Sequence, residues 1–178
     1  RFNADHLLED SPVIDIYPES IAFDDYVMFH YLYKDTYWLL GQNLRTYGLS
    51  KKQETVYMKD LNLDRFIIDS NEILWGAASY NGLVIIDLQK RKEIAHFIND
   101  PLDENSISDN NINCLFKDSN GFLWIGTEFG LNRLQQNVDS LAINNPETYS
   151  SARFSDLDFI RLQKQDGLSG NAIKSMLE

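Results

Sequence analysis

The sequence predicts an all-β protein made of repeated four-stranded antiparallel sheets. Aromatic residues favour strands, and they make up 12% of the 178 residues. Short apolar runs alternate with polar turns, and no helical periodicity extends beyond about two turns. Trp38, Trp75 and Trp124 recur at intervals of 37 and 49 residues (75 − 38 and 124 − 75), each in a similar local pattern. Repeats of about 40 to 50 residues are typical of β-propeller blades.

One stretch defines the repeated unit: DSNGFLWIGTEFGLNRL, residues 118–134. It contains an Asp, a polar turn, an apolar strand around a Trp, two small residues, and a Gly-Leu that opens the next strand. The side chains of Asp118 and Asn120 can bond nearby backbone, and Gly121 tolerates a positive φ. DSNG therefore predicts a tight turn between two antiparallel strands.

Weaker copies of this unit occur on both sides of it. Residues 65–88 form a second copy, in which Asp69 precedes Trp75 by six positions (75 − 69), as in the first unit. Residues 26–47 form a third copy with a shortened turn, KDTY. Residues 170–178, GNAIKSMLE, match the beginning of the first strand in the clearest repeat. We therefore predict a further repeat that starts there.

Each copy reads as four short strands, which we interpret as one propeller blade. The expected divisions are repeats at 26–58, 64–97 and 111–164, the start of a next blade at 171–178, and residues 1–25 unplaced. Closed propellers have about four to eight blades. The chain, with about three to four, is therefore expected to be a segment of a larger propeller. Two insertions, 99–110 and 135–158, are expected to be loops that extend from this scaffold.

The charge of the chain restricts its partners. Its net charge is −11 and its pI is about 4.6, without a basic stripe, so we expect no nucleic-acid binding. The same negative charge disfavours binding to anionic membrane surfaces. No apolar run approaches the length of a membrane helix, so any attachment would come from a transmembrane helix elsewhere in the parent protein. Cys114, the only cysteine, excludes an internal disulfide and a cysteine-based zinc cluster.

The residues do not predict a catalytic site, a metal site or a cofactor. The glycines of GTEFG and GQNLRTYG lie between strands, whereas a phosphate-binding loop opens a helix. The three histidines have no partner at helical spacing: His6, His30 and His96. Two adjacent carboxylate pairs could serve as an acid and a base, but they read better as solvated charges: Asp24-Asp25 and Asp103-Glu104.

Blade topology points to one face as the candidate binding site. In a four-stranded blade, the turn between strands two and three lies on the same face as the connection to the next blade. The candidates on that face are Tyr80, Asn81, Glu128, Phe129, Asp103 and Asn105. Aromatic rings stack on the C–H faces of sugars, and amide or carboxylate groups bond their hydroxyls. This combination predicts a carbohydrate ligand, although ordinary polar loops remain the alternative for each residue.

The repeat resembles the two-component regulator propeller repeat. INCLFKDSNGFLWIGTEFGLNRL, residues 112–134, has the Asp-polar-polar-Gly-apolar-Trp-Ile-Gly-Thr core of that family and its Gly-Leu. DSNEILWGAASYNGLVIIDL, residues 69–88, looks like a degenerate copy in which Glu72 replaces the turn glycine. QKQDGLSGNAIKSMLE, residues 163–178, is similar to the family's Gly-Leu-Ser before a new first strand. The resemblance covers roughly residues 26–178.

This resemblance implies a sensor. Such repeats build large propellers in the periplasmic part of membrane-bound hybrid histidine kinases of Bacteroidetes, many of which respond to glycan fragments. It implies a non-enzymatic ligand-sensing domain for two-component signal transduction, whose partners are an oligosaccharide or small molecule, further blades or domains of the same sensor, and a second protomer in a homodimer. The alternatives are a polysaccharide lyase or hydrolase with a propeller fold, and a scaffold for protein–protein contacts.

Overall fold

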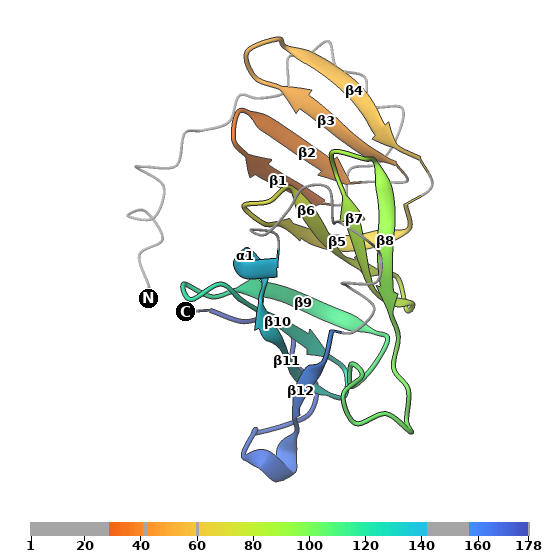
Figure 1. The fold of residues 1–178 in the computed structure, drawn as a ribbon, viewed down its shortest axis with the longest axis vertical. Coiled ribbons are helices and arrows are strands. Elements are labelled where there is room, and N and C mark those ends of the chain that lie inside the picture. Colours follow the sequence, from red (N-terminus) through yellow and green to blue (C-terminus); the bar gives the residue numbers. More distant parts are fainter. Residues whose placement is uncertain (1–28, 41–42, 60, 142–156, 178) are drawn as a thin grey trace, which may run out of the picture.

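The computed structural model describes residues 29–40, 43–59, 61–141 and 157–177, with side chains described from residue 32 onward. Within these ranges, twelve strands form three four-stranded antiparallel sheets, called blades A, B and C here (Figure 1). Blade A has β1 (Phe29–Tyr33), β2 (Thr36–Leu40), β3 (Leu44–Gly48) and β4 (Gln53–Met58). Blade B has β5 (Leu63–Ile68), β6 (Ile73–Ala78), β7 (Gly82–Asp87) and β8 (Lys92–Phe97). Blade C has β9 (Ile112–Lys117), β10 (Phe122–Thr127), β11 (Gly130–Asn137) and β12 (Phe159–Leu162).

The predicted fold class is confirmed, because each blade is a simple antiparallel meander in sequence order. The blades stack one after another, and β5 of blade B contacts both β1 and β9, the first strands of its neighbours (Figure 1). The helical elements in the described ranges are short: α1 (Val138–Leu141) and a 3-10 turn (Lys164–Asp166). No helix in those ranges is long and apolar enough to span a bilayer.

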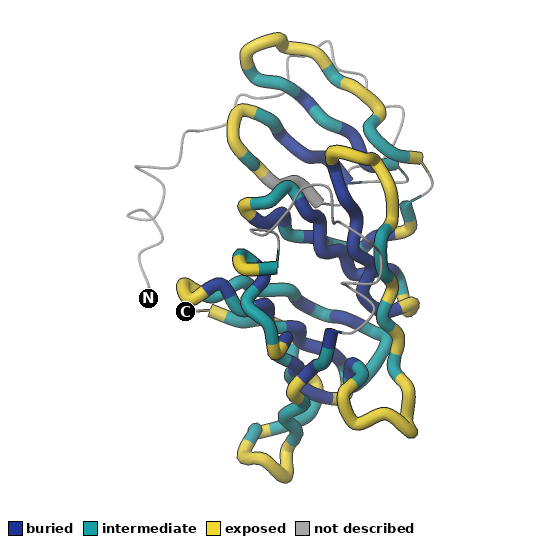
Figure 2. The backbone as a smooth tube through the Cα atoms, viewed as in Figure 1, coloured by how far each residue is buried: buried dark blue, intermediate teal, exposed yellow. Residues whose placement is uncertain are grey.

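Burial follows the position of each strand in the stack. Every residue of β6 and β7 is buried, because both faces of blade B are covered by neighbouring blades (Figure 2). Their sequences, ILWGAA and GLVIID, are accordingly almost continuously apolar rather than alternating. By contrast, β4 and β8 are outer edge strands, with exposed and partly buried residues. The central blade therefore has the most hydrophobic strands of the chain.

Two hydrophobic cores hold the blades together, and each is built around a tryptophan. Trp38 belongs to the core between blades A and B, and Trp75, with no exposed surface, belongs to the core between blades B and C. Trp124 differs. Its neighbour Ile125 faces blade B, so Trp124 points to the opposite, open side of blade C and remains partly exposed. Burial in a core is thus observed for Trp38 and Trp75, and is only partial for Trp124.

The spacing of six residues between Asp and Trp has a structural cause. Asp118 Oδ1 accepts bonds from the backbone N–H of Asn120 (3.0 Å) and Phe122 (2.9 Å), while Oδ2 accepts one from Trp124 Nε1 (2.8 Å). One carboxylate thus closes the turn between the first two strands and fixes the indole of the second strand. Gly121 in this turn has a φ of 81°, the left-handed conformation that favours glycine.

The second blade repeats this arrangement atom for atom. Asp69 Oδ1 accepts from Asn71 N (2.8 Å) and Ile73 N (3.1 Å), and Oδ2 accepts from Trp75 Nε1 (3.0 Å). Glu72 occupies the position of the turn glycine with a φ of 63°. We call this three-bond arrangement the Asp–Trp clamp.

Blade A lacks the clamp. Its turn between β1 and β2 has only two residues, and Leu32 stands six positions before Trp38. The indole Nε1 of Trp38 is buried and has no hydrogen-bond partner among the described residues. The weak sequence match of this repeat therefore reflects a real difference in the turn.

Residues 171–177 follow blade C without forming a strand. Ile173 N nevertheless donates to Thr127 O (2.9 Å), and its side chain lies against Gly126 on the open side of β10. The start of a next blade at this point stays a prediction, as do the repeat boundaries. The unplaced residues 1–25, which include His6 and the Asp24-Asp25 pair, lie outside the described residues.

Candidate functional site

The candidate residues lie on what we call the loop-bearing face: turns 79–81 and 128–129 and the connection 98–111. Both turns join the second and third strands of their blades, and 98–111 runs from β8 to β9. Backbone bonds hold these segments together. Gly82 N donates to Asn110 O (3.0 Å), and Glu128 N donates to Asn111 O (3.1 Å). The predicted clustering of both turns around the connecting loop is therefore what the structure shows.

Tyr80 and Phe129 are the exposed aromatic side chains of these two turns. Tyr80 is 79% exposed and Phe129 is 58% exposed. Tyr80 has a φ of 53°, and the turn is closed by a bond from Asn81 N to Ala78 O (2.9 Å). The following Gly82 is required, because its φ is 82° and a Cβ would lie 2.1 Å from Phe97 O. Each ring is thus presented to solvent by a turn whose backbone is fixed.

Asn81 and Glu128 accompany these rings, but both already make contacts within the chain. His96 Nε2 lies 2.5 Å from Asn81 O, which uses the backbone and not the side-chain amide. Glu128 forms an ion pair with Lys174, and the hydrogen bond from this lysine lowers the pKa of the Glu128 carboxyl. A ligand that bonds Glu128 would therefore share the carboxylate with Lys174.

Asp103 and Asn105 lie apart from the two turns, against the outermost strand of blade C. Asp103 Oδ1 accepts a bond from Asn105 N (2.9 Å), and Asn105 O accepts one from Phe159 N at the start of β12 (2.8 Å). The Asp103 carboxylate therefore stabilises its own loop. Four of the six candidates therefore lie on the turns 79–81 and 128–129, and the other two lie beside β12.

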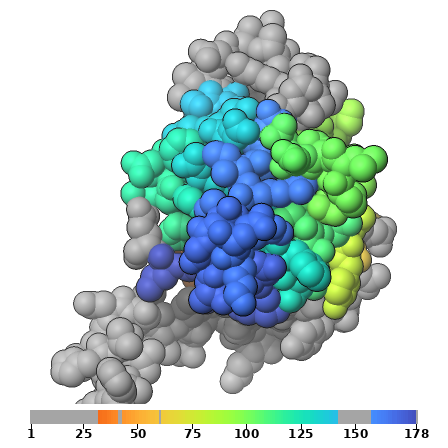
Figure 3. Space-filling model, turned by 90° about the horizontal axis from the view of Figure 1, so that it is seen from below, coloured from red at the N-terminus to blue at the C-terminus, as the bar shows by residue number. Residues whose placement is uncertain are grey.

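Arg161 is the residue that sequence reasoning missed on this face. Its guanidinium donates to the carbonyls of Ser106 (2.5 Å), Asp103 (2.7 Å), Ile107 (3.3 Å) and Asp100 (3.4 Å), and to the Ser106 hydroxyl. Residues 157–177 accordingly pack beside the β8–β9 connection in Figure 3. More than fifty residues separate Arg161 from this loop, and no local sequence signal marks such a pairing.

A buried polar network fixes the other end of the connection. Thr127 and Asn132 have no exposed surface. Ser108 N donates to Asn132 Oδ1 (2.8 Å), and the Ser108 and Thr127 hydroxyls are 2.8 Å apart. Thr127 Oγ1 also accepts from Phe129 N (3.1 Å). The threonine of the Gly-Thr motif therefore links the loop to the turn that carries Phe129.

The groups exposed on the loop-bearing face can bind a ligand. Among the described residues, no group of three or more His, Cys, Asp or Glu side chains could hold a metal ion. The one described candidate acid/base pair, Asp103-Glu104, is adjacent on an exposed loop, and Asp103 accepts a backbone bond. Exposed rings beside amide and carboxylate groups match a ligand with apolar faces and hydroxyl edges.

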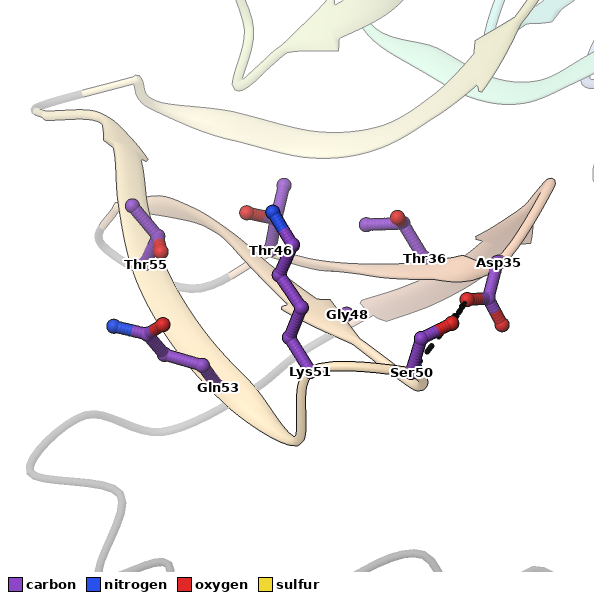
Figure 4. A pocket seen from close by; sticks show the side chains of 8 residues that line it. All are labelled: Asp35, Thr36, Thr46, Gly48, Ser50, Lys51, Gln53 and Thr55. Carbon is purple, nitrogen blue, oxygen red and sulfur yellow. Dashed lines mark hydrogen bonds between the residues drawn. The ribbon is translucent and has the colours of Figure 1, made fainter.

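A hollow lies in blade A, at the end of the strands opposite to the loop-bearing face (Figure 4). It has a volume of about 320 Å³. Its lining is polar: Asp35, Thr36, Thr46, Gly48, Ser50, Lys51, Gln53 and Thr55. None of these residues was a candidate from the sequence, because scattered threonines in strands carry no distinctive motif.

Comparison with known proteins identifies the repeat. The family model described as two component regulator propeller matches residues 106–129, which confirms the resemblance seen in that segment. No curated protein matches the chain.

Several solved structures match part of their length to this chain. One is the extracellular domain of BT3049 from B. thetaiotaomicron, a protein assigned as a hybrid two component system, with a TM-score of 0.52 and 16% identity over 85% of this chain. A similarly assigned extracellular domain, BT4673 of the same organism, has a TM-score of 0.41 and 18% identity over 86% of this chain. The N-terminal domain of Nup159 has a TM-score of 0.43 and 14% identity over 61% of this chain. The chain spans only 24%, 25% and 27% of these three structures, respectively. At such identities the likeness to BT3049 supports the fold of stacked blades.

Proposed function

Given that the chain carries a two component regulator propeller repeat within a stack of three blades, we propose that it is part of the ligand-sensing domain of a two-component sensor. In this proposal the domain lies in the periplasm, outside the inner membrane, and the histidine kinase chemistry belongs to other parts of the polypeptide. The family match and the fold shared with the extracellular domain of BT3049 support this assignment.

The ligand we propose is a carbohydrate, bound on the loop-bearing face without turnover. One observation carries this proposal: Tyr80 and Phe129, both largely exposed, occupy equivalent turns of neighbouring blades and are held by one rigid connection. Two rings carried by turns with a fixed backbone can stack on a sugar chain without the cost of ordering those loops on binding. Asn81 and Glu128, next to the rings, supply groups that bond hydroxyls.

Signalling then requires a difference in affinity between two arrangements of the sensor. A carbohydrate that binds one arrangement of a homodimer more tightly than another shifts the population towards it, whereas equal affinity would shift nothing. The loop-bearing face spans two blades, so the affinity of a ligand there can depend on how these blades contact a second protomer or domain.

Titration of the chain with a panel of neutral and acidic oligosaccharides tests the binding site. Calorimetry follows binding, and a reducing-end assay on the same samples follows cleavage. We expect heat without new reducing ends, and a loss of affinity of roughly 10-fold or more for Tyr80→Ala or Phe129→Ala, as for an aromatic anchor. Leu102→Ala, at a residue that is 95% exposed in the same connection, is the matched control and should leave affinity unchanged.

Each other outcome has a defined meaning. New reducing ends would establish a polysaccharide-cleaving enzyme and refute the sensing proposal. Binding that both aromatic variants retain would move the site away from the loop-bearing face. If no oligosaccharide bound, the carbohydrate proposal would fail, and a scaffold for protein contacts would take its place.

A further inference from the structure

The hollow in blade A lies at the end of the blade where the turn between β1 and β2 is shortened. In blades B and C, four residues separate the first two strands, and the clamp aspartate accepts a hydrogen bond from the tryptophan Nε1. In blade A only Lys34 and Asp35 connect β1 to β2. The shorter turn brings no carboxylate to Trp38, and the polar hollow opens at this same end of the blade.

The lining side chains come from one face of blade A. Thr46 is the cross-strand partner of both Trp38 and Thr55, and Gly48 is the partner of Thr36 and Gln53. Residues two apart along a strand share a face, so these positions form two adjacent rows that face the same way as Trp38. The β3–β4 turn adds Ser50 and Lys51 at the edge, as Figure 4 shows.

Gly48 keeps the hollow open. A Cβ at this position would meet only Lys51 Cβ, at 3.9 Å, so space lies above the backbone in the middle of the lining. The φ of Gly48 is not in the left-handed region, so a larger residue fits the strand without backbone strain. A side chain placed there would project into the hollow without breaking the sheet.

The residues that line the hollow carry several groups that can form hydrogen bonds. Three threonine hydroxyls and the Gln53 amide can each donate and accept hydrogen bonds. Lys51 adds an ammonium group to the lining, and none of the ion pairs among the described residues includes it. Asp35 Oδ2 accepts from Ser50 N (3.3 Å) and from the Ser50 hydroxyl, while no described residue donates to Oδ1.

We propose that this hollow is a second binding site, for a sugar acid: a monosaccharide-sized ligand that carries hydroxyl groups and one carboxylate. The carboxylate pairs with Lys51, and the hydroxyls bond the threonines and Gln53. An anion without hydroxyls would leave the threonines and Gln53 without a partner on the ligand, and a neutral sugar would leave the Lys51 ammonium without an opposite charge. A volume of about 320 Å³ has room for a ligand of this size.

This site is independent of the loop-bearing face. The β1–β2 and β3–β4 turns lie at the opposite end of the strands from the turns that join second and third strands. The lining residues all belong to blade A, whereas Tyr80 and Phe129 belong to blades B and C. The outcome of a test of this site is therefore independent of carbohydrate binding at the loop-bearing face.

The test compares three probes with the isotope-labelled chain by NMR titration: glucuronate, glucose and acetate. Glucuronate should shift the amide signals of residues 46–55 with a Kd on the order of 1 mM, the affinity expected of so small a ligand. Glucose lacks the charge and acetate lacks the hydroxyls, so each should bind at least about 10-fold more weakly. Failure of glucuronate to bind, or equal binding of all three probes, would overturn the proposal.

Four variants locate the site. Gly48→Val fills the hollow and should abolish the shifts, while Lys51→Gln should weaken glucuronate about 10-fold. Lys52→Gln removes the same charge from the neighbouring residue, which does not line the hollow, and should change the affinity less than about 2-fold. Tyr80→Ala should have no effect. If Gly48→Val, shown to be folded by its amide spectrum, bound glucuronate as tightly as the unmodified chain, the site would lie elsewhere.

Discussion

Replacing Asp69 by alanine tests the Asp–Trp clamp directly. The Asp69 side chain is 1% exposed and accepts three bonds, from Asn71 N, Ile73 N and Trp75 Nε1. Alanine leaves these three donors in place without an acceptor. Water can reach Asn71, which is partly exposed, but the amide of Ile73 and the indole of Trp75 belong to fully buried residues.

The expected loss of stability follows from these two buried donors. Each buried donor left unsatisfied costs about 1–3 kcal/mol, which gives about 2–6 kcal/mol for the pair. Burial also raises the pKa of Asp69, because the charged form is desolvated, so removing the carboxylate removes part of this cost. We therefore expect the free energy of unfolding to fall by about 2–4 kcal/mol.

Urea unfolding of the chain, followed by circular dichroism and by tryptophan fluorescence, measures this loss. Asp118→Ala removes the same three bonds at a partly exposed clamp, and we expect roughly half the loss because water can replace the carboxylate there. Glu104→Ala, at an exposed carboxylate, should change stability by less than about 0.5 kcal/mol. If Asp69→Ala unfolded at the same urea concentration as Glu104→Ala, the clamp would have no energetic role.

Two further predictions concern the tryptophans and the pH dependence. Trp75→Phe should cost about 1–3 kcal/mol more than Trp38→Phe in urea unfolding, because Trp75 alone of the two gives up a hydrogen bond to a buried carboxylate; equal losses would contradict this. Partial burial raises the pKa of Asp139, but the hydrogen bonds from Lys117 and Ser70 and the charge of Lys117 together outweigh it and hold the pKa below the ordinary 3.8. This contribution is present above pH 3.8 and is lost as the pH falls through the lower folded value, so Asp139→Asn should flatten the fall in Tm below about pH 4. An unchanged profile in that variant would remove Asp139 as a source of acid sensitivity.

Most of the fold could be predicted because its determinants are local. Apolar runs bounded by turn residues mark the strands, and the Asp–Trp spacing marks the turn between the first two strands in blades B and C. The candidate face followed from topology alone, since antiparallel strands bring alternate turns to the same end. Tyr80 and Phe129 became candidates in this way, and both are exposed in the structure, while their role in binding stays a prediction.

The contacts that shape this face could not be predicted. Arg161 reaches carbonyls more than fifty residues away, and Lys174 pairs with Glu128 across a similar separation. Asp103 appeared available for a ligand, but its carboxylate is used by a neighbouring backbone amide. Such pairings depend on which blades pack together, and that information is not contained in any one repeat.

The sequence by itself determined the strand pattern, the chemistry of each clamped turn and the repeat family, because each depends on residues within one short segment. The tertiary structure alone decided the accessibility of each tryptophan. Trp75 and Trp124 have the same clamp, yet Trp75 is fully buried between two blades and Trp124 lies on an open face. It alone also decided where space remains, as in the hollow of blade A. Burial and cavities depend on how whole sheets pack, and therefore appear only once the blades are assembled.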